Sequence, residues 1–385
     1  MVRYDRKQQR EGTLRIIRLR HAAGRLALIM GALWLVAAAL LDFHTSSSWL
    51  WAQQSVPAPD VTADTCTVDA DGTAHVTRVI PVPPTISPEA QKFISRPGPS
   101  GPEPTLAERR ALTDAFRKGR AEEARKLYPV NIEGKTLGGV SCDIITPTEL
   151  IASKTGNGVL INVHGGGFNS DSGSLVEGIP VAYLTHIPVV SVYYRLAPEH
   201  PFPAAVDDTE AVYKELLKTY EARHVGLFGT SAGAILTAEV ASRLRRDGLP
   251  LPAALGIFSG TGDLSKRGDS EALFTIWGWP GHLEPPFKGG HVPAYVGSTD
   301  PQDPVLSPLY ADLHGFPPTL FVTSTRDLLL SGTTILHRAF LRAGVDAELV
   351  VFEALPHAFW YDYHLPETKE ALDLMARFFS ERLGK

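Results

Sequence analysis

Cysteine is scarce in this chain, with two among 385 residues. Cys66 and Cys142 are too few for a disulfide scaffold, so a bridge between them would be a single staple, and two unpaired thiols are an equally open alternative. The sequence contains no Cys-x-x-Cys motif and no Cys/His cluster. A structural zinc site of the usual spacing is therefore not expected.

An excess of positive charge is also lacking, because 37 Lys and Arg stand against 42 Asp and Glu, for a formal net charge of −5. A nucleic-acid-binding surface needs a Lys/Arg excess, so we expect no nucleic-acid partner. No internal repeat is visible. With 34 Gly, 30 Pro and 44% hydrophobic residues, the composition is that of a globular, enzyme-sized chain with long, shaped loops.

The N-terminus departs from this acidic balance. Residues 1–52 hold eight Lys or Arg and three Asp or Glu, and the basic run precedes Leu26–Leu41, which carries no charge. Sixteen helical residues span about 24 Å, short of the ~30 Å hydrocarbon core, so the pattern favours a cleaved signal peptide over a membrane anchor at residues 26–41. Both alternatives predict an extracytoplasmic location for the rest of the chain.

Residues 53–135 are expected to form a proline-rich arm followed by a cap helix. Residues 53–104 contain ten prolines, which argues against a regular helix or central strand and favours an extended arm or linker. Thr105 and Glu108 then form a Thr-x-x-Glu capping box, which predicts a helix that runs to about Leu127.

From about residue 136 to the end, short apolar runs alternate with helical patterns. This alternation predicts an α/β fold with a mostly parallel central sheet flanked by helices on both faces. The expected strands lie at 158–163, 188–194, 224–228, 253–259, 319–324 and 347–353, and the expected helices at 205–219, 232–247, 331–343 and 366–382. The alternation stops at about 261–308, which is rich in Gly, Pro and aromatic residues and is interpreted as an insertion.

The strongest chemical signal is the sequence Gly-Thr-Ser-Ala-Gly at 229–233. It lies between a predicted strand and a predicted helix, where a sharp turn would hold Ser231 exposed as a nucleophile. A second glycine motif, His-Gly-Gly-Gly at 164–167, follows another strand. Backbone N–H groups of Gly165, Gly166 and Gly167, with that of Ala232, could stabilise the oxyanion formed during acyl transfer.

A nucleophilic serine needs a histidine as base and an acid that orients the histidine. In chains where the serine lies on a sharp strand-to-helix turn, a nucleophile elbow, the acid follows the serine in the sequence and the histidine follows the acid. His357 is the histidine that comes just after a predicted strand in a loop before a helix. Asp327 follows the preceding strand, whereas the competing Asp303 lies in a proline-rich loop and Asp346 at a strand start. We therefore predict the triad Ser231, Asp327 and His357, with no metal and no organic cofactor.

These motifs, together with Tyr-Arg-Leu-Ala-Pro-Glu-His-Pro-Phe-Pro-Ala-Ala-Val-Asp-Asp at 194–208, resemble the hormone-sensitive-lipase-like esterases of the α/β-hydrolase superfamily. The resemblance implies an α/β-hydrolase fold whose cap is formed by the N-terminal region and the insertion. It implies a serine carboxylesterase acting on a small-molecule ester with a short or medium acyl chain. The sequence departs from the family at Thr230, where many members have Asp, and in the leucines that follow Asp327.

Several alternatives stay open. Phe168, Trp277 and Trp279 are candidates for the substrate pocket, but the insertion's aromatics could equally form its own small core. Glu199, His200 and Asp208 are expected to brace the loop beside the elbow, with Arg195 pairing an acid. A lactone or amide hydrolase would use the same triad, and a non-catalytic binding module on this fold is a third possibility.

Overall fold

The computed structural model describes residues 64–96, 104–148, 158–171, 173, 175–273, 275–277, 282–284 and 292–383. The chain divides into two units, Met1–Pro81 and Val82–Lys385. Within the first unit the described residues form an antiparallel hairpin of β1 (Thr65–Val68) and β2 (Ala74–Thr77), and all eight strand residues are exposed.

An eight-stranded sheet forms the centre of the second unit, in the order β12-β11-β8-β7-β5-β6-β4-β3. Neighbours from β12 to β6 pair in parallel, while β4 and β3 are antiparallel. The strands are β3 (Val130–Leu137), β4 (Val140–Pro147), β5 (Val159–Val163), β6 (Val189–Val192), β7 (Val225–Thr230), β8 (Ala254–Phe258), β11 (Thr319–Ser324) and β12 (Ala347–Phe352).

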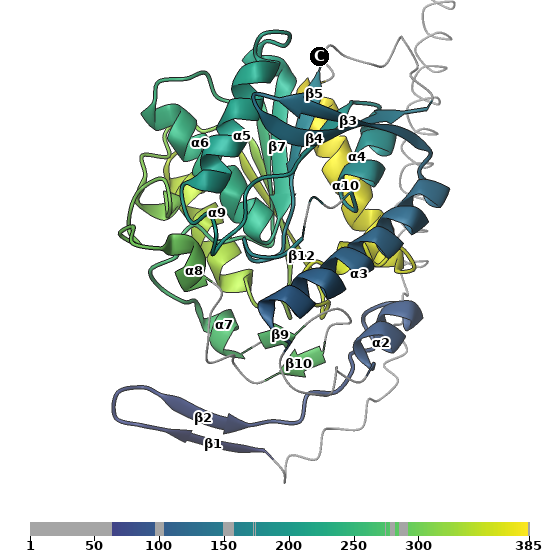
Figure 1. Ribbon diagram of the computed structural model, residues 1–385. Helices are drawn as coiled ribbons and strands as arrows, with labels where there is room; N and C mark the ends of the chain where they lie inside the picture. The colour runs from purple at the N-terminus through teal and green to yellow at the C-terminus, as the bar shows by residue number, and fades with distance from the viewer. Residues whose placement is uncertain are drawn as a thin grey trace, which may run out of the picture. The chain divides into compact units, whose positions relative to one another are not determined.

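Helices cover both faces of this sheet (Figure 1). One hydrophobic core joins the sheet to α5 (Ala204–Leu216), α6 (Ala232–Arg246) and α9 (Leu330–Arg342). A second core, on the other face, includes α4 (Gly178–Thr185) and α10 (Pro366–Leu383). The expected α/β-hydrolase architecture is confirmed, with its mostly parallel sheet between two helical layers.

The six predicted strands are all present, within a few residues of their expected bounds. Every residue of β5, β6, β7, β8 and β11 is buried, as continuous apolar runs require when both faces of a strand are covered. No apolar run predicted β3 or β4. The sheet consequently begins at Val130, inside the range expected for the N-terminal region.

The expectation of a helix-free proline-rich arm is wrong at one place. Helix α2 (Pro88–Ile94) lies inside it, with Ser87 as its N-cap and Pro88 in its first turn. Proline is tolerated there because the first N–H groups of a helix have no partner within the helix. The Ser87 backbone N–H and hydroxyl donate to the Glu367 carboxylate at 2.8 and 2.9 Å, which attaches α2 to α10.

Helix α3 (Leu106–Leu127) confirms the predicted capping box. The Thr105 hydroxyl accepts from the Glu108 N–H, and the Glu108 carboxylate accepts from the Thr105 N–H at 2.8 Å. This helix packs against α4 and contributes Ala121 and Ala124 to the second core, so the N-terminal cap region is part of the unit that carries the sheet.

The predicted insertion lies in the chain between β8 and β11, which are neighbours in the sheet. Its described elements are α7 (Asp269–Leu273), an antiparallel pair of β9 (Thr275–Trp277) and β10 (His282–Glu284), and α8 (Val292–Val296). Short 3-10 turns lie at Ala222–His224, Pro308–Tyr310 and Phe359–Tyr361.

The two cysteines lie in different units, so a bridge between them stays a prediction. Cys142 lies 2% exposed in β4, within the first core, and Cys66 is exposed on β1; both thiols are free. Burial raises the pKa of Cys142 to about 12. No helix among the described residues is long and apolar enough to cross a membrane, and the segment 26–41 lies outside them.

Candidate active site

Ser231 lies at the turn between β7 and α6 in the strained conformation that a nucleophile elbow requires. Its φ is 60° and its ψ is −121°, a conformation that residues with a Cβ rarely adopt. The two flanking glycines permit the turn. A Cβ on Gly229 would lie 2.2 Å, and one on Gly233 1.9 Å, from the carbonyl oxygen of Val163. The elbow is thus pressed against the end of β5, and only glycine fits at these two positions.

The glycine loop after β5 lies directly beside this turn. A Cβ on Gly165 would be 3.3 Å from the Cβ of Ser231 and 3.0 Å from the Thr230 carbonyl oxygen. Gly166 has a φ of 99° and Gly167 one of 62°, and the carbonyl oxygen of Gly166 accepts from the Ser170 N–H at 3.0 Å. Ala232 is the first residue of α6, where N–H groups lack a helical partner. Gly165 and Ala232, two of the four predicted oxyanion donors, therefore lie next to Ser231, and the roles of all four stay predictions.

Asp327 and His357, the predicted acid and base, are in direct contact. Asp327 comes three residues after β11 and His357 five residues after β12, and the His357 Nδ1 lies 2.8 Å from the Asp327 Oδ1. The His357 side chain is 14% exposed and the Asp327 side chain is 1% exposed. The acid is thus sealed from water while the imidazole remains partly accessible, as a base that must reach a substrate requires.

The structure adds partners for Asp327 that the sequence did not reveal. The Ser259 hydroxyl donates to its Oδ2, the Thr323 hydroxyl donates to the same oxygen at 2.8 Å, and the Leu329 N–H donates to Oδ1 at 2.9 Å. Burial by itself raises the pKa of this carboxyl, but the charge and hydrogen bond of His357 and the other donors outweigh it, and the pKa of Asp327 lies below its ordinary value. Asp327 is therefore ionised at neutral pH.

A direct contact also joins the loop that carries His357, called the histidine loop below, to the nucleophile elbow at Ser231. Trp360, three residues after His357, donates its Nε1–H to the hydroxyl of Thr230 at 3.0 Å, and Thr230 immediately precedes Ser231. Strand β7, which leads to Ser231, is separated from β11 by β8 alone, and β12 adjoins β11. The serine, the acid and the histidine thus all come from the carboxyl ends of nearby parallel strands, where sites of open α/β sheets lie.

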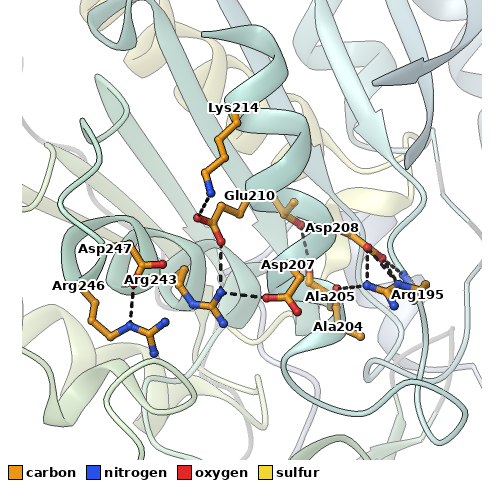
Figure 2. A network of polar contacts seen from close by, with 11 residues as sticks. Arg195, Ala204, Ala205, Asp207, Asp208, Glu210, Lys214, Arg243, Arg246 and Asp247 are labelled. Atoms are coloured by element: carbon orange, nitrogen blue, oxygen red, sulfur yellow. Dashed lines mark hydrogen bonds and ion pairs between the residues drawn. The ribbon is translucent and has the colours of Figure 1, made fainter. Parts of the chain in front are cut away.

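The stretch 194–208 braces the structure as the sequence predicts. The Arg195 guanidinium pairs with the Asp208 carboxylate at 2.8 to 3.0 Å, and Glu199 pairs with Arg110 of α3 at 2.7 Å. Figure 2 shows the Arg195 pair together with Arg243, which bridges two carboxylates of α5. Because Arg243 belongs to α6, this contact fixes the helix that follows Ser231.

The structure describes the three aromatic residues proposed for the substrate pocket to different extents. Phe168 is 3% exposed and stacks on Tyr295 of α8, with ring centroids 3.5 Å apart, so its ring belongs to the packing between the glycine loop and the insertion. Trp277 is the last residue of β9, and Trp279 lies outside the described residues. Their roles in substrate binding stay predictions. In the described part of the chain, no three His, Cys, Asp or Glu side chains group as a metal site.

A buried acid beside the elbow gives folding stability a pH dependence. Glu177, the residue before α4, is 3% exposed; burial raises its pKa to about 7, although a hydrogen bond from Tyr361 and the charge of Arg117 oppose this. The unfolded chain binds fewer protons than the folded one between about pH 4.5 and 7, so this group's contribution to stability is complete below that range and is lost as pH rises through it.

In the wild type, the ionisation of Glu177 should lower the free energy of unfolding by about 3 kcal/mol between pH 4.5 and 8. We expect Glu177→Gln to abolish this decrease. Urea denaturation at several pH values measures it. The exposed Glu133, replaced by Gln in the same way, serves as the control and should leave the wild-type slope intact. An unchanged slope in E177Q would contradict the assignment of this titration to Glu177.

Comparison with known proteins agrees with the fold. A model of the alpha/beta hydrolase fold family matches residues 160–361. An acetyl-hydrolase of Streptomyces hygroscopicus is 36% identical over 202 residues, covering 51% of this chain and 66% of that protein. An esterase of Acinetobacter venetianus is 28% identical over 245 residues, covering 60% of this chain and 77% of that one.

Two solved structures share the architecture. A crystal structure of an esterase superimposes with a TM-score of 0.69 at 34% identity, covering 80% of this chain and 98% of the other. That of an esterase from the bacterial hormone-sensitive lipase family superimposes with a TM-score of 0.66 at 30% identity, covering 77% and 99%. On its sheet order, its elbow and the family model that matches more than half of its length, this chain belongs to the alpha/beta hydrolase fold family.

Proposed function

We propose that this protein is a serine carboxylesterase that hydrolyses small esters with short to medium acyl chains. The observation that carries the proposal is the 2.8 Å contact between His357 and the buried, ionised Asp327, with a serine held at positive φ at the end of the nearby strand β7. Relatives named as an acetyl-hydrolase and an esterase support ester hydrolysis.

In this reaction His357 takes the proton of the Ser231 hydroxyl as Oγ attacks the ester carbonyl. Asp327 accepts the hydrogen bond from Nδ1–H, which fixes the tautomer that leaves Nε2 free for the proton. The imidazolium that forms lies next to a carboxylate shielded from water, where the attraction between the two charges is stronger than in solution.

Negative charge that develops on the former carbonyl oxygen needs donors already in place. Gly165 of the glycine loop and the first residue of α6 both adjoin Ser231, and backbone donors of the kind that we propose here contribute a few kcal/mol each to the transition state. The alcohol leaves with the proton from His357. Water then attacks the acyl-enzyme with His357 again as the base, so no cofactor is required.

The substrate class is tested by an acyl-length series of p-nitrophenyl esters from C2 to C16, with a matched anilide and a lactone. We expect the highest kcat/KM between C2 and C8 and a steep fall beyond C10. A maximum beyond C10 would contradict the short-chain assignment. Anilide or lactone turnover faster than that of the ester would instead favour an amide or lactone hydrolase on the same residues.

A further inference from the structure

A buried arginine of the N-terminal helix α3 lies beneath the glycine loop. Arg117 is 5% exposed, and its Nε lies 3.0 Å from the Oδ2 of Asp171, which is 2% exposed. The guanidinium carbon also lies 4.1 Å from the centre of the Tyr361 ring. Removing a cation from water in this way has a large desolvation cost. Here an ion pair and an aromatic ring offset part of that cost.

Arg117 reaches the part of the site where the oxyanion would form. A Cβ on Gly165 would stand 3.7 Å from its Nη2, and the same Cβ would stand 3.3 Å from that of Ser231. The guanidinium is therefore close to the first glycine of the predicted oxyanion loop. Asp171, its ion-pair partner, follows that loop by four residues, so the pair clamps the loop from its far end as well.

The surroundings of Arg117 extend to the other two catalytic loops. The Tyr361 hydroxyl donates to Glu177, and the neighbouring Trp360 donates to the hydroxyl of Thr230. Asn162, near the end of β5, donates to the same Glu177 carboxylate at 3.4 Å. One buried cluster thus joins the strand before the glycine loop, the residue before Ser231 and the loop that carries His357.

The charges in this cluster favour a cation at its centre. Burial by itself lowers the pKa of Arg117, but the Tyr361, Asp171 and Glu177 side chains outweigh it and hold the pKa above its ordinary value. His164, at the start of the glycine loop, is 1% exposed, and burial lowers its pKa. Arg117 is therefore the permanent positive charge behind the loop, next to a histidine that burial keeps neutral.

We propose that Arg117 is a positioning residue for catalysis, which holds the glycine loop, through Asp171, and the histidine loop, through Tyr361, in the arrangement that the oxyanion requires. This inference rests on the proposed esterase function. It also gives α3 a part in the chemistry beyond covering the sheet, because the helix supplies this arginine from outside the α/β alternation. An ester in its ground state makes little use of the oxyanion donors, so loss of the clamp should affect the transition state more than substrate binding.

The test compares Arg117→Gln with Arg120→Gln in the full chain. Arg120 lies one turn further along α3 and pairs with Glu123 and with Asp362, which follows Tyr361 in the histidine loop. Its loss weakens the docking of the helix on the histidine loop but removes no contact with the glycine loop, so it isolates the effect of docking alone. For R117Q we expect kcat for p-nitrophenyl butyrate to fall about 10- to 100-fold, with KM within about threefold of wild type. R120Q should lower the melting temperature and leave kcat near the wild-type value.

Two further measurements separate positioning from a general structural role. A trifluoromethyl ketone, which forms a charged adduct with the serine, should bind R117Q more weakly by the same factor as kcat falls. Arg117→Lys should recover part of the rate, because it keeps the charge and loses the planar contacts. Should R117Q not fold, Tyr361→Phe removes the hydroxyl that reaches Glu177 while keeping the ring, and is expected to lower kcat by a smaller factor.

The outcomes distinguish this inference from the function on which it rests. A wild-type protein that hydrolyses no ester would overturn both. An active wild type with a folded R117Q of unchanged kcat would overturn the role of Arg117 alone, as would equal losses of kcat in R117Q and R120Q. An inhibitor affinity that stays at the wild-type level while kcat falls would also count against it, and so would Tyr361→Phe with full activity if R117Q does not fold.

Discussion

Replacing Ser231 with alanine is expected to lower kcat for p-nitrophenyl butyrate by about 10⁵- to 10⁶-fold, the loss typical of a catalytic serine. The hydroxyl is the atom that forms the acyl-enzyme, and its removal leaves the oxyanion donors and His357 without a nucleophile. A fluorophosphonate probe, which labels activated serines, should modify the wild type and leave S231A unmodified. Turnover by S231A above about one hundredth of the wild-type rate would remove Ser231 from the mechanism.

The fold should survive this change, because the Ser231 side chain makes no capping hydrogen bond to α6. A matched variant, Ser231→Gly, separates chemistry from stability. Glycine adopts a φ of 60° without the penalty that a Cβ carries, so S231G should be as inactive as S231A and about 1 kcal/mol more stable in urea denaturation. Equal stability of the two variants would show that the elbow stores no backbone strain.

The strands of the inner sheet were predictable because of their environment. Strands such as β5, β7 and β11 are buried on both faces, so they are written as continuous apolar runs. The edge strand β3 has exposed or half-exposed residues along most of its length, and its neighbour β4 has them at half of its positions. Polar and glycine residues in β3, such as Glu133 and Gly134, hide it from a search for apolar runs.

The site residues that directly follow a predicted strand could be predicted from the sequence. Those that reach the site through contacts between distant segments could not. Asp327 was preferred to Asp303 and Asp346 because it follows a buried strand, and the structure brings it to His357. Its hydroxyl partner Ser259 is 68 residues away in the chain and belongs to no motif. The role of Arg117 is harder still to predict, because α3 is rich in charged residues and its sequence is typical of a solvent-exposed helix. Only the fold shows that Arg117 is buried.

The second large effect is expected at Asp327, where two substitutions should differ. Its Oδ1 accepts from His357 and from the Leu329 backbone N–H, and its Oδ2 from the hydroxyls of Ser259 and Thr323. A backbone N–H can only donate, whereas hydroxyls can also accept. In Asp327→Asn the side-chain NH₂ group should therefore turn toward the hydroxyls, and its oxygen should stay on His357 and keep the correct tautomer.

We accordingly expect D327N to lose the carboxylate charge alone, with kcat about 10²- to 10³-fold below wild type, while Asp327→Ala also frees the imidazole and should lose about 10⁴-fold. D327A leaves buried donors without an acceptor, which should lower the free energy of unfolding by about 1 to 3 kcal/mol. The control is Asp346→Asn, an exposed surface acid paired with Arg382, which should keep full activity. Equal losses in D327N and D327A would mean that the amide turns the other way and holds the wrong tautomer, and activity retained in both would assign the acid to another residue.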